Sequence, residues 1–354
     1  WNVSKETNMN NLFENILELS DEDFSKWDVS NVINMKHMFV GCRNFKGIGL
    51  EKWYVNNVVN MSNMFSECTN LTGTTLKTWN VSNVTDMSNM FAGCSNFDIN
   101  LGDWEPLKIK NINGMFSHCR NFTGHGLDKW NIQNITSLYN VFRYCENFTG
   151  KTIEHWDTYN IKNLWGTFQG CKNLNCNLQE WNVDNIGNMS MAFMDCDNFT
   201  GVGLNTWKLN NLINISKVFK NCKNLDCDLN MWVVSSITYM DSMFENCHKF
   251  KGNGLENWNV DNVQSMKNMF AGCSEFNGNL TNWRVNTVKN MNGMFANCTK
   301  FEGLGLETWT TNSVSDIEKI FLNCINFDAD LTTWIIDNIQ DMSYMFKGCE
   351  KFTG

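Results

Sequence analysis

Residues 79–101 read WNVSNVTDMSNMFAGCSNFDINL, and the next tryptophan, Trp104, follows three positions later. Phe stands twelve residues after each repeat Trp, and Cys stands fifteen residues after it in all copies but the first. A fixed period of this kind predicts a solenoid, in which each repeat forms one coil and equivalent residues stack into columns. The repeat tryptophans are spaced by 25 or 26 residues and are Trp1, Trp27, Trp53, Trp79, Trp104, Trp130, Trp156, Trp181, Trp207, Trp232, Trp258, Trp283, Trp309 and Trp334.

The spacing of apolar residues changes within one coil. Trp27, Val29 and Val32 alternate with polar residues, which favours a short strand followed by a bend. The Met-x-x-Met-Phe-x-x-Cys segment at 35–42 has three- and four-residue spacing, which is typical of a short helix or a 3-10 turn. The sequence therefore predicts short parallel strands plus one short helix or 3-10 turn in each 25/26-residue coil.

The loops that return the chain to the next Trp have two lengths. The shorter loop has the form [FL]-[DN]-x-[DN]-L, as at residues 97–101, and the longer loop contains a glycine in register. From Trp130 onward the two lengths alternate, so any face built from these loops repeats every second coil. The glycines of the longer loop are Gly47, Gly73, Gly124, Gly150, Gly201, Gly252 and Gly303.

The unbroken period predicts one body rather than several globular domains. We expect a single solenoid of about fourteen coils over residues 1–354, because no linker composition interrupts the repeat. Residues 1–26 form a divergent first coil without Cys, which is either close to a polar cap or a degenerate internal copy. Because the chain starts at Trp1 and stops within a coil, we expect it to be a fragment of a longer chain.

The charge and hydropathy of the chain exclude several classes of partner. The formal net charge is -9, and no stretch carries the basic stripe that nucleic acid or an anionic membrane requires. No apolar run approaches the roughly 18 residues of a membrane span, so we expect no direct membrane span in this segment.

The aromatic columns are expected to form a dry core. In two neighbouring coils the core columns are Trp79, Phe91, Cys94, Phe97, Trp104, Phe116 and Cys119. A row of tryptophans could instead stack sugars or bases. Trp at every coil in register with Val, Met and Phe favours the core. Trp165 lies off the column and is the better candidate for an exposed aromatic residue.

The cysteine column is expected to consist of buried free thiols. Residues stacked at about 4.8 Å have Cβ atoms farther apart than the 3.5–4.5 Å typical of a disulfide, although oxidation of some adjacent pairs remains an alternative. One Cys per coil without a histidine partner does not support zinc, and no cofactor is expected. Cys176 and Cys227 lie in short loops, where we expect exposed thiols.

Asparagine columns, such as Asn57, Asn60 and Asn70 in one coil, are expected to form ladders whose amides satisfy the backbone of the turns. They also create glycosylation sequons, largely as a consequence of the repeat. The possible glycosylation sites are Asn60, Asn70, Asn80, Asn83, Asn121, Asn147 and Asn198.

The short loops carry paired oxygen ligands of the kind that Ca²⁺ prefers, although an Asx-type turn explains the same pattern. The weak calcium candidates are Asp98, Asp226, Asp228, Asp328 and Asp330. The five histidines share no column, and no nucleophile and base stand in a recognisable pattern. We therefore expect that the chain is not an enzyme.

The repeat resembles the BspA-like leucine-rich repeat surface proteins, in particular the subclass with the form W-[DN]-V-S-x-V-x-x-M-x-x-M-F-x-x-C-x-x-F. The resemblance covers the whole chain and implies a solenoid of leucine-rich-repeat type on a secreted or cell-surface protein, with adhesion to host or matrix components. The glycine-containing long loops depart from the Asn-Gln-Pro-Leu segment that other members carry there.

Two functional hypotheses follow from the repeat and the resemblance. The first is a non-catalytic extracellular or cell-surface protein that mediates adhesion, binding other proteins or surface glycans through regular rows of loops. Equivalent loops engage many equivalent epitopes at a high effective concentration. The second is a structural subunit of a filament or surface assembly, in which solenoids associate with copies of themselves.

Overall fold

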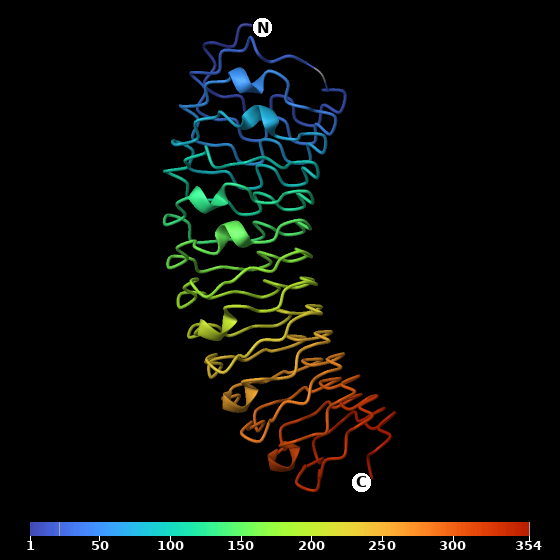
Figure 1. The fold of residues 1–354 in the computed structure, drawn as a ribbon. Coiled ribbons are helices and arrows are strands. Elements are labelled where there is room, and N and C mark those ends of the chain that lie inside the picture. The colour runs from blue at the N-terminus through green and yellow to red at the C-terminus, as the bar shows by residue number, and fades with distance from the viewer. Residues whose placement is uncertain (21, 354) are drawn as a thin grey trace. The chain divides into compact units, whose positions relative to one another are not determined.

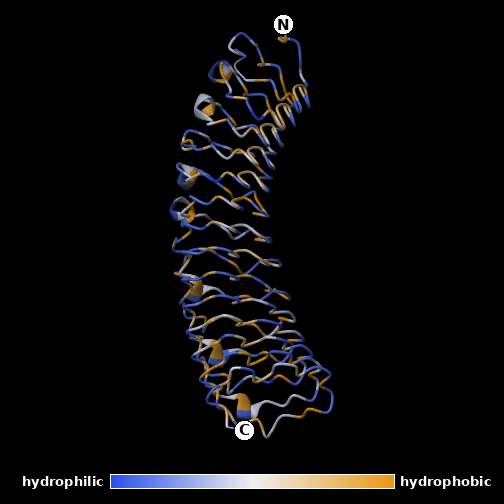
Figure 2. Ribbon diagram, turned by 90° about the vertical axis from the view of Figure 1, so that its right-hand side faces the viewer, coloured by the Kyte–Doolittle hydropathy of each residue, from blue (hydrophilic) through white to orange (hydrophobic). Residues whose placement is uncertain are grey.

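The computed structural model describes residues 1–20 and 22–353. It consists of two compact units, Trp1–Cys176 and Asn177–Gly354, and within each unit the coils stack in sequence order (Figure 1). In each unit the short 3-10 helices lie along one edge of the stack (Figure 2). These helices are η1 (Leu50–Lys52), η2 (Thr74–Leu76), η3 (Leu127–Lys129), η4 (Lys151–Ile153), η5 (Leu204–Thr206), η6 (Leu255–Asn257) and η7 (Leu306–Thr308).

A parallel backbone ladder joins neighbouring coils along the Met-to-Cys segment. The N–H groups of Met61, Asn63, Phe65 and Glu67 each donate to a carbonyl of the next coil, at 2.9, 2.8, 2.9 and 2.7 Å. The intervening N–H groups bond within the coil, three residues back, as Cys68 does to the carbonyl of Phe65 at 3.0 Å. Isolated parallel bridges mark the start of this ladder in both units. Within each unit, neighbouring coils are therefore bonded to each other through their backbones, as a solenoid of leucine-rich-repeat type requires.

The fold class is confirmed, but the expected positions of strand and helix within the coil were wrong. The ladder runs through the Met-to-Cys segment, whereas Trp27–Val32 contains an Asx turn in which Ser30 N–H donates to Asp28 Oδ1 at 3.1 Å. The helical spacing of Met and Phe arises from consecutive turns. The two residues ten and fourteen positions after each Trp have positive φ, for example 56° at Asn63 and 64° at Glu67. A right-handed helix cannot continue through left-handed residues.

The aromatic and cysteine columns fill the interior of each unit, and hydrophobic and hydrophilic residues alternate along each coil (Figure 2). The indole rings of Trp53 and Trp79 lie 6.2 Å apart and nearly parallel, and the rings of Phe91 and Phe97 lie 4.0 Å apart. The core-column residues Trp79, Phe91, Cys94, Phe97, Trp104, Phe116 and Cys119 are all buried. What remains for binding is the set of side chains that point outward.

The first coil keeps the same path with a different interior. Trp1 is 89% exposed and stacks on Trp27 at 6.3 Å, while Phe24 is buried and its carbonyl accepts the Nε1–H of Trp53 at 3.0 Å. Leu19 and Phe24 supply apolar contacts in a coil that has Ile16 where the others have Cys. In its described residues the first coil thus differs in packing partners, while Asn11 and Asn15 keep the positive φ of the other coils.

Candidate interaction site

The cysteine column stabilises the backbone. Sγ of Cys94 donates to the carbonyl of Phe65 in the preceding coil at 2.9 Å, and Sγ of Cys119 donates to that of Phe91 at 2.9 Å. Burial is the main cause that raises the pKa of both thiols. All 15 cysteines are free thiols in the structure. Neutral thiols without solvent access are poor nucleophiles, so this column offers no reactive group.

Cys176 and Cys227 are not exposed, which corrects the expectation from the sequence. Cys176 is 2% exposed, and Cys227 is half-buried. Each lies against the glycine of the preceding long loop: a Cβ added at Gly150 would come within 2.5 Å of Cys176 Sγ, and one at Gly201 within 2.7 Å of Cys227 Sγ. Burial raises the pKa of both thiols to about 12. Because glycine has no side chain, each of these positions leaves the space that the thiol occupies.

The acidic residues of the short loops accept hydrogen bonds. Asp98 Oδ1 accepts from the N–H and the hydroxyl of Thr123 in the next coil, at 3.0 and 2.7 Å. Asp328 accepts in the same way from Thr353, Asp226 pairs with Lys251, and Asp228 and Asp330 close Asx turns with Asn230 and Thr332. Residues 1–20 and 22–353 contain no group of three or more His, Cys, Asp or Glu that could hold a metal ion. Calcium binding at these loops stays a prediction.

The sequon asparagines differ in accessibility. Asn60 and Asn83 are half-buried, and Nδ2 of Asn83 donates to the carbonyl of Asn56 in the preceding coil at 2.7 Å. A glycan on Asn83 would replace a proton of the amide that forms this ladder. The exposed sequon residues are Asn70, Asn80, Asn121, Asn147 and Asn198. Glycosylation stays a prediction.

Shallow polar grooves lie beside the tryptophan column. One in the first unit, of about 660 Å³, is lined by Lys52, Tyr54 and Asn80 among others, and one in the second unit, of about 630 Å³, by Asp261 and Arg284 among others. Neither offers an indole face, because Trp53 and Trp258 are 4% and 1% exposed. From Trp53 to Trp334 the tryptophan column therefore lacks the open ring surface that stacking of sugars or bases requires, whereas Trp1 at the first coil is exposed.

The long loops present a regular outward row. Each of the seven contains a 3-10 helix that follows a left-handed glycine, as η5 follows Gly203 with φ 90°. A Cβ on Gly203 would lie 2.3 Å from the backbone nitrogen of Gln179, so only glycine permits this approach to the preceding loop. The carbonyl of Val202 accepts the N–H of Leu178 at 3.1 Å, while the Val202 side chain is 52% exposed. We name Ile48, Val202 and Leu304, which lie between paired glycines, the long-loop tips; Ile48 is 41% and Leu304 53% exposed.

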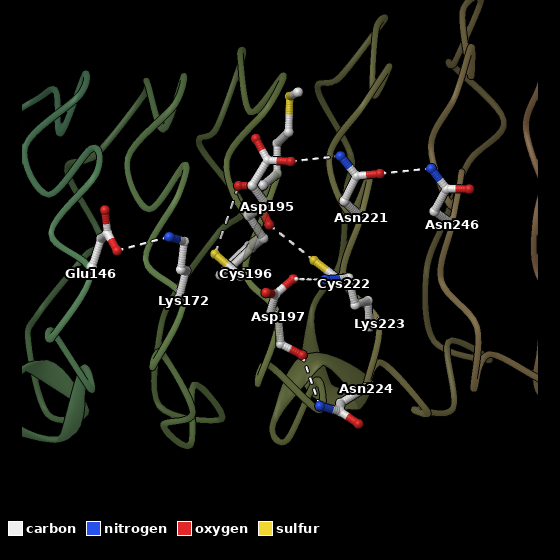
Figure 3. A network of polar contacts seen from close by, with 12 residues as sticks. Glu146, Lys172, Asp195, Cys196, Asp197, Asn221, Cys222, Lys223, Asn224 and Asn246 are labelled. Carbon is white, nitrogen blue, oxygen red and sulfur yellow. Dashed lines mark hydrogen bonds and ion pairs between the residues drawn. The ribbon is translucent and has the colours of Figure 1, made fainter.

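In the second unit, outward side chains of the segment that carries the backbone ladder form a row of amide hydrogen bonds. In the column fourteen residues after Trp, Nδ2 of Asn221 donates to Asp195 Oδ1 at 2.6 Å, and Nδ2 of Asn246 donates to Asn221 Oδ1 at 2.8 Å (Figure 3). In the column sixteen residues after Trp, Lys172 pairs with Glu146 at 2.8 Å. These polar groups satisfy one another between coils, so such stretches have few groups left for a ligand.

In the first unit the same face carries a different set of side chains, the aromatic cluster, composed of His118, Tyr139, Arg143, Tyr144 and Trp165. The rings of Tyr139 and Trp165 stack at 4.9 Å, and those of His118 and Tyr144 lie 4.8 Å apart. The Arg143 guanidinium lies 5.1 Å from the centre of Tyr144 and 6.0 Å from that of Trp165. Burial, and then the charge of Arg143, lower the pKa of His118. The cluster therefore combines a neutral imidazole, an arginine cation and a ring stack.

The sequence analysis identified only Trp165 of this cluster. The structure brings Trp165 together with Tyr139, because each stands nine residues after its Trp in successive coils, and Trp165 is half-buried rather than fully exposed. A signal was available, since that column holds Ser62, Ser88 and Asn113 in the three preceding coils. Two consecutive large aromatic residues in a column of small polar ones mark a local departure from the repeat.

A family described as "Mycoplasma protein of unknown function, DUF285" matches residues 1–74, 41–151, 136–258 and 239–354, which together cover the whole chain. The chain belongs to this family. No curated protein matches the DUF285 chain at a significant level. Among its described residues, no helix has the length and apolar composition to cross a membrane.

Solved structures similar to this DUF285 chain are leucine-rich repeat proteins at low identity. A leucine rich cell surface protein from Faecalibacterium prausnitzii is 14% identical, with a TM-score of 0.31, covering 77% of this chain and 76% of that one. A plant peptide hormone receptor, RGFR1 in complex with RGF2, is 9% identical, with a TM-score of 0.24, covering 88% and 56%. An internalin from Listeria monocytogenes is 12% identical, with a TM-score of 0.22, covering 82% of both chains. TM-scores this low carry no argument about ligands or partners.

Proposed function

We propose that this chain is a non-catalytic interaction module of an extracellular or cell-surface protein of the BspA-like type, and that it adheres to other proteins through the long-loop tips. The observation that carries the proposal is that long loops of both units carry exposed apolar tips. Ile48, Val202 and Leu304 are 41–53% exposed on loops whose backbone is fixed by left-handed glycines. Exposed apolar side chains on a rigid backbone lose little conformational entropy when a partner covers them.

The interior of the coils supports a binding role over a catalytic one. The thiols of the cysteine column, such as those of Cys94 and Cys119, donate to backbone carbonyls, and burial raises their pKa. The outward positions vary freely between coils, whereas the inward positions keep one residue type. Several weak contacts along one chain combine into firm adhesion when the partner surface also repeats.

The experiment compares the wild-type chain with a triple variant, Ile48→Ser, Val202→Ser and Leu304→Ser, on immobilised fibronectin, laminin and collagen. The matched control is Ile33→Ser, Leu107→Ser and Ile213→Ser, which removes apolar side chains that are 50%, 61% and 60% exposed elsewhere. We expect saturable adherence of the wild type and of the control to at least one of these proteins. The tip variant should adhere at least about tenfold more weakly, since truncating central apolar contacts costs roughly 1 kcal/mol or more each.

Two results would contradict the proposal. Equal adherence of a folded tip variant would remove the long-loop tips from the interaction. Growth of the chain into larger species with rising concentration in sedimentation velocity, without adherence to any of the three proteins, would favour a structural subunit that binds copies of itself.

A further inference from the structure

The aromatic cluster is the strongest departure from the repeat on the outward surface of the first unit. Tyr139 is 40% exposed and its ring lies nearly parallel to that of Trp165, at 13°. The two rings stack face to face across consecutive coils, so the edges and uncovered faces of the pair form an exposed apolar surface against which a ligand can pack. The Phe and Cys columns of the core continue beneath this pair through Phe116, Phe142 and Cys145, which are buried.

Arg143 has no carboxylate partner in this platform. Its guanidinium contacts only the rings of Tyr144 and Trp165, and no described residue forms an ion pair or a side-chain hydrogen bond with it. By contrast, Arg120 pairs with Glu146 at 3.8 Å. An arginine left without a carboxylate in a chain of net charge -9 is an available site for an anion.

Buried polar atoms without partners gather at the same place. Among the described residues, the buried side-chain atoms that lack a hydrogen-bond partner include Arg143 Nε, Asn140 Oδ1 and Asn113 Oδ1. Asn113 and Tyr139 occupy the same column in successive coils, and Asn140 and Arg143 belong to the coil that carries Tyr139. Buried polar groups are normally bonded, so these atoms mark a place where the packing of the repeat leaves hydrogen-bonding capacity unused.

We propose that the aromatic cluster binds a saccharide that carries a single carboxylate; this rests on the proposed role of the chain as an interaction module. The apolar face of a pyranose ring packs against the exposed surface of the stacked Tyr139–Trp165 pair, and the carboxylate accepts hydrogen bonds from the guanidinium of Arg143. One arginine beside an imidazole whose pKa is lowered supplies one positive charge, which matches one carboxylate. A polyanion such as a nucleic acid or a sulfated glycan chain is disfavoured by the acidic surface of the whole chain.

The test titrates the full chain with 3′-sialyllactose and with lactose at pH 7, and follows ligand protons by saturation-transfer NMR. We expect saturable binding of 3′-sialyllactose below about 10 mM and binding of lactose at least about tenfold weaker, because the charge-assisted contact is lost. Saturation should be strongest for protons on one face of the sialic acid ring.

Two variants probe the two halves of the site. Arg143→Gln should weaken 3′-sialyllactose binding at least about tenfold, and Trp165→Ala should do the same, while Trp165→Phe retains most of the binding because a ring is kept. The matched controls are Arg43→Gln and Tyr54→Ala, exposed residues of the same unit outside the cluster, which should bind as the wild type does. Circular dichroism confirms that each variant is folded.

The inference is overturned if 3′-sialyllactose does not bind, if folded Arg143→Gln binds as tightly as wild type, or if a single-stranded oligonucleotide binds more tightly than the saccharide. The long-loop tip variant is titrated alongside. Its unchanged saccharide binding with lost adherence to matrix proteins supports two separate sites. Adherence without any saccharide binding would refute the cluster and leave the proposed function standing.

Discussion

The thiol of Cys176 gives a quantitative test of the dry interior. An ordinary thiol has a pKa near 9.0, and burial raises that of Cys176 to about 12. At pH 8 the thiolate fraction is then about one in ten thousand, compared with about one in ten for an ordinary thiol, a difference of about a thousandfold. Because the thiolate is the reactive form, alkylation of folded Cys176 should be slower than alkylation of the unfolded chain by at least that factor.

The assay is a timed exposure to iodoacetamide at pH 8, followed by quenching, digestion and mass spectrometry, with the urea-unfolded chain as reference. Cys176 should label at least about a thousandfold more slowly in the folded chain than in the unfolded one, since burial limits access as well as ionisation. Lys77→Cys provides a control, because an exposed position in the same unit should label at nearly the unfolded rate. Labelling of Cys176 within about tenfold of the unfolded rate would refute the assignment of this thiol to the interior.

Three further perturbations test the fold. A buried thiol whose pKa is raised stabilises the folded state fully below about pH 9, and this stabilisation is lost as the pH rises toward the pKa of the folded state. Each such thiol should lower the free energy of unfolding by about 1.4 kcal/mol per pH unit in that range. An unfolding midpoint in urea that stays constant from pH 8 to 11 would contradict this. Phe116→Ala removes a ring that stacks on Phe122 at 4.1 Å. It should lower the free energy of unfolding, measured by urea titration, by about 3–5 kcal/mol. A loss below about 1 kcal/mol would exclude Phe116 from the core. Gly126→Ala places a Cβ 2.1 Å from the backbone nitrogen of Gly102 at φ 87°, and it should lower the free energy of unfolding by about 1–3 kcal/mol. Gly102→Ala should lower it less, because the nearest contact of its Cβ is a side-chain oxygen at 3.0 Å. The reverse order would refute the loop geometry.

The interior columns could be predicted from the sequence because burial keeps one residue type at each position. Trp79, Phe91 and Cys94 recur in register, and all are buried as a solenoid requires. The loop glycines were visible for the same reason, since a Cβ at a left-handed position such as Gly124 would lie 2.4 Å from the ring of Phe148 in the next coil. The hydrogen bond from each thiol to a carbonyl was not visible, because residue spacing does not show the direction of the S–H group.

Secondary structure within the coil could not be placed from spacing alone. The three- and four-residue intervals from Met61 to Cys68 are those of a helix, but Asn63 and Glu67 have positive φ, and glutamate does not signal that conformation. The segment therefore forms turns and an inter-coil ladder. The aromatic cluster was missed because its residues break a column instead of continuing it. A search for periodicity identifies only the residues that recur.

The most direct test of adhesion through the long-loop tips is hydrogen–deuterium exchange of the chain, free and bound to the matrix protein to which it adheres. Binding should slow exchange in peptides that contain η1, η5 and η7, with the loops of Ile48, Val202 and Leu304 protected most. The segments that carry the backbone ladder should exchange alike in both states. Protection confined to the ladder face, with the long loops unchanged, would contradict the proposed function.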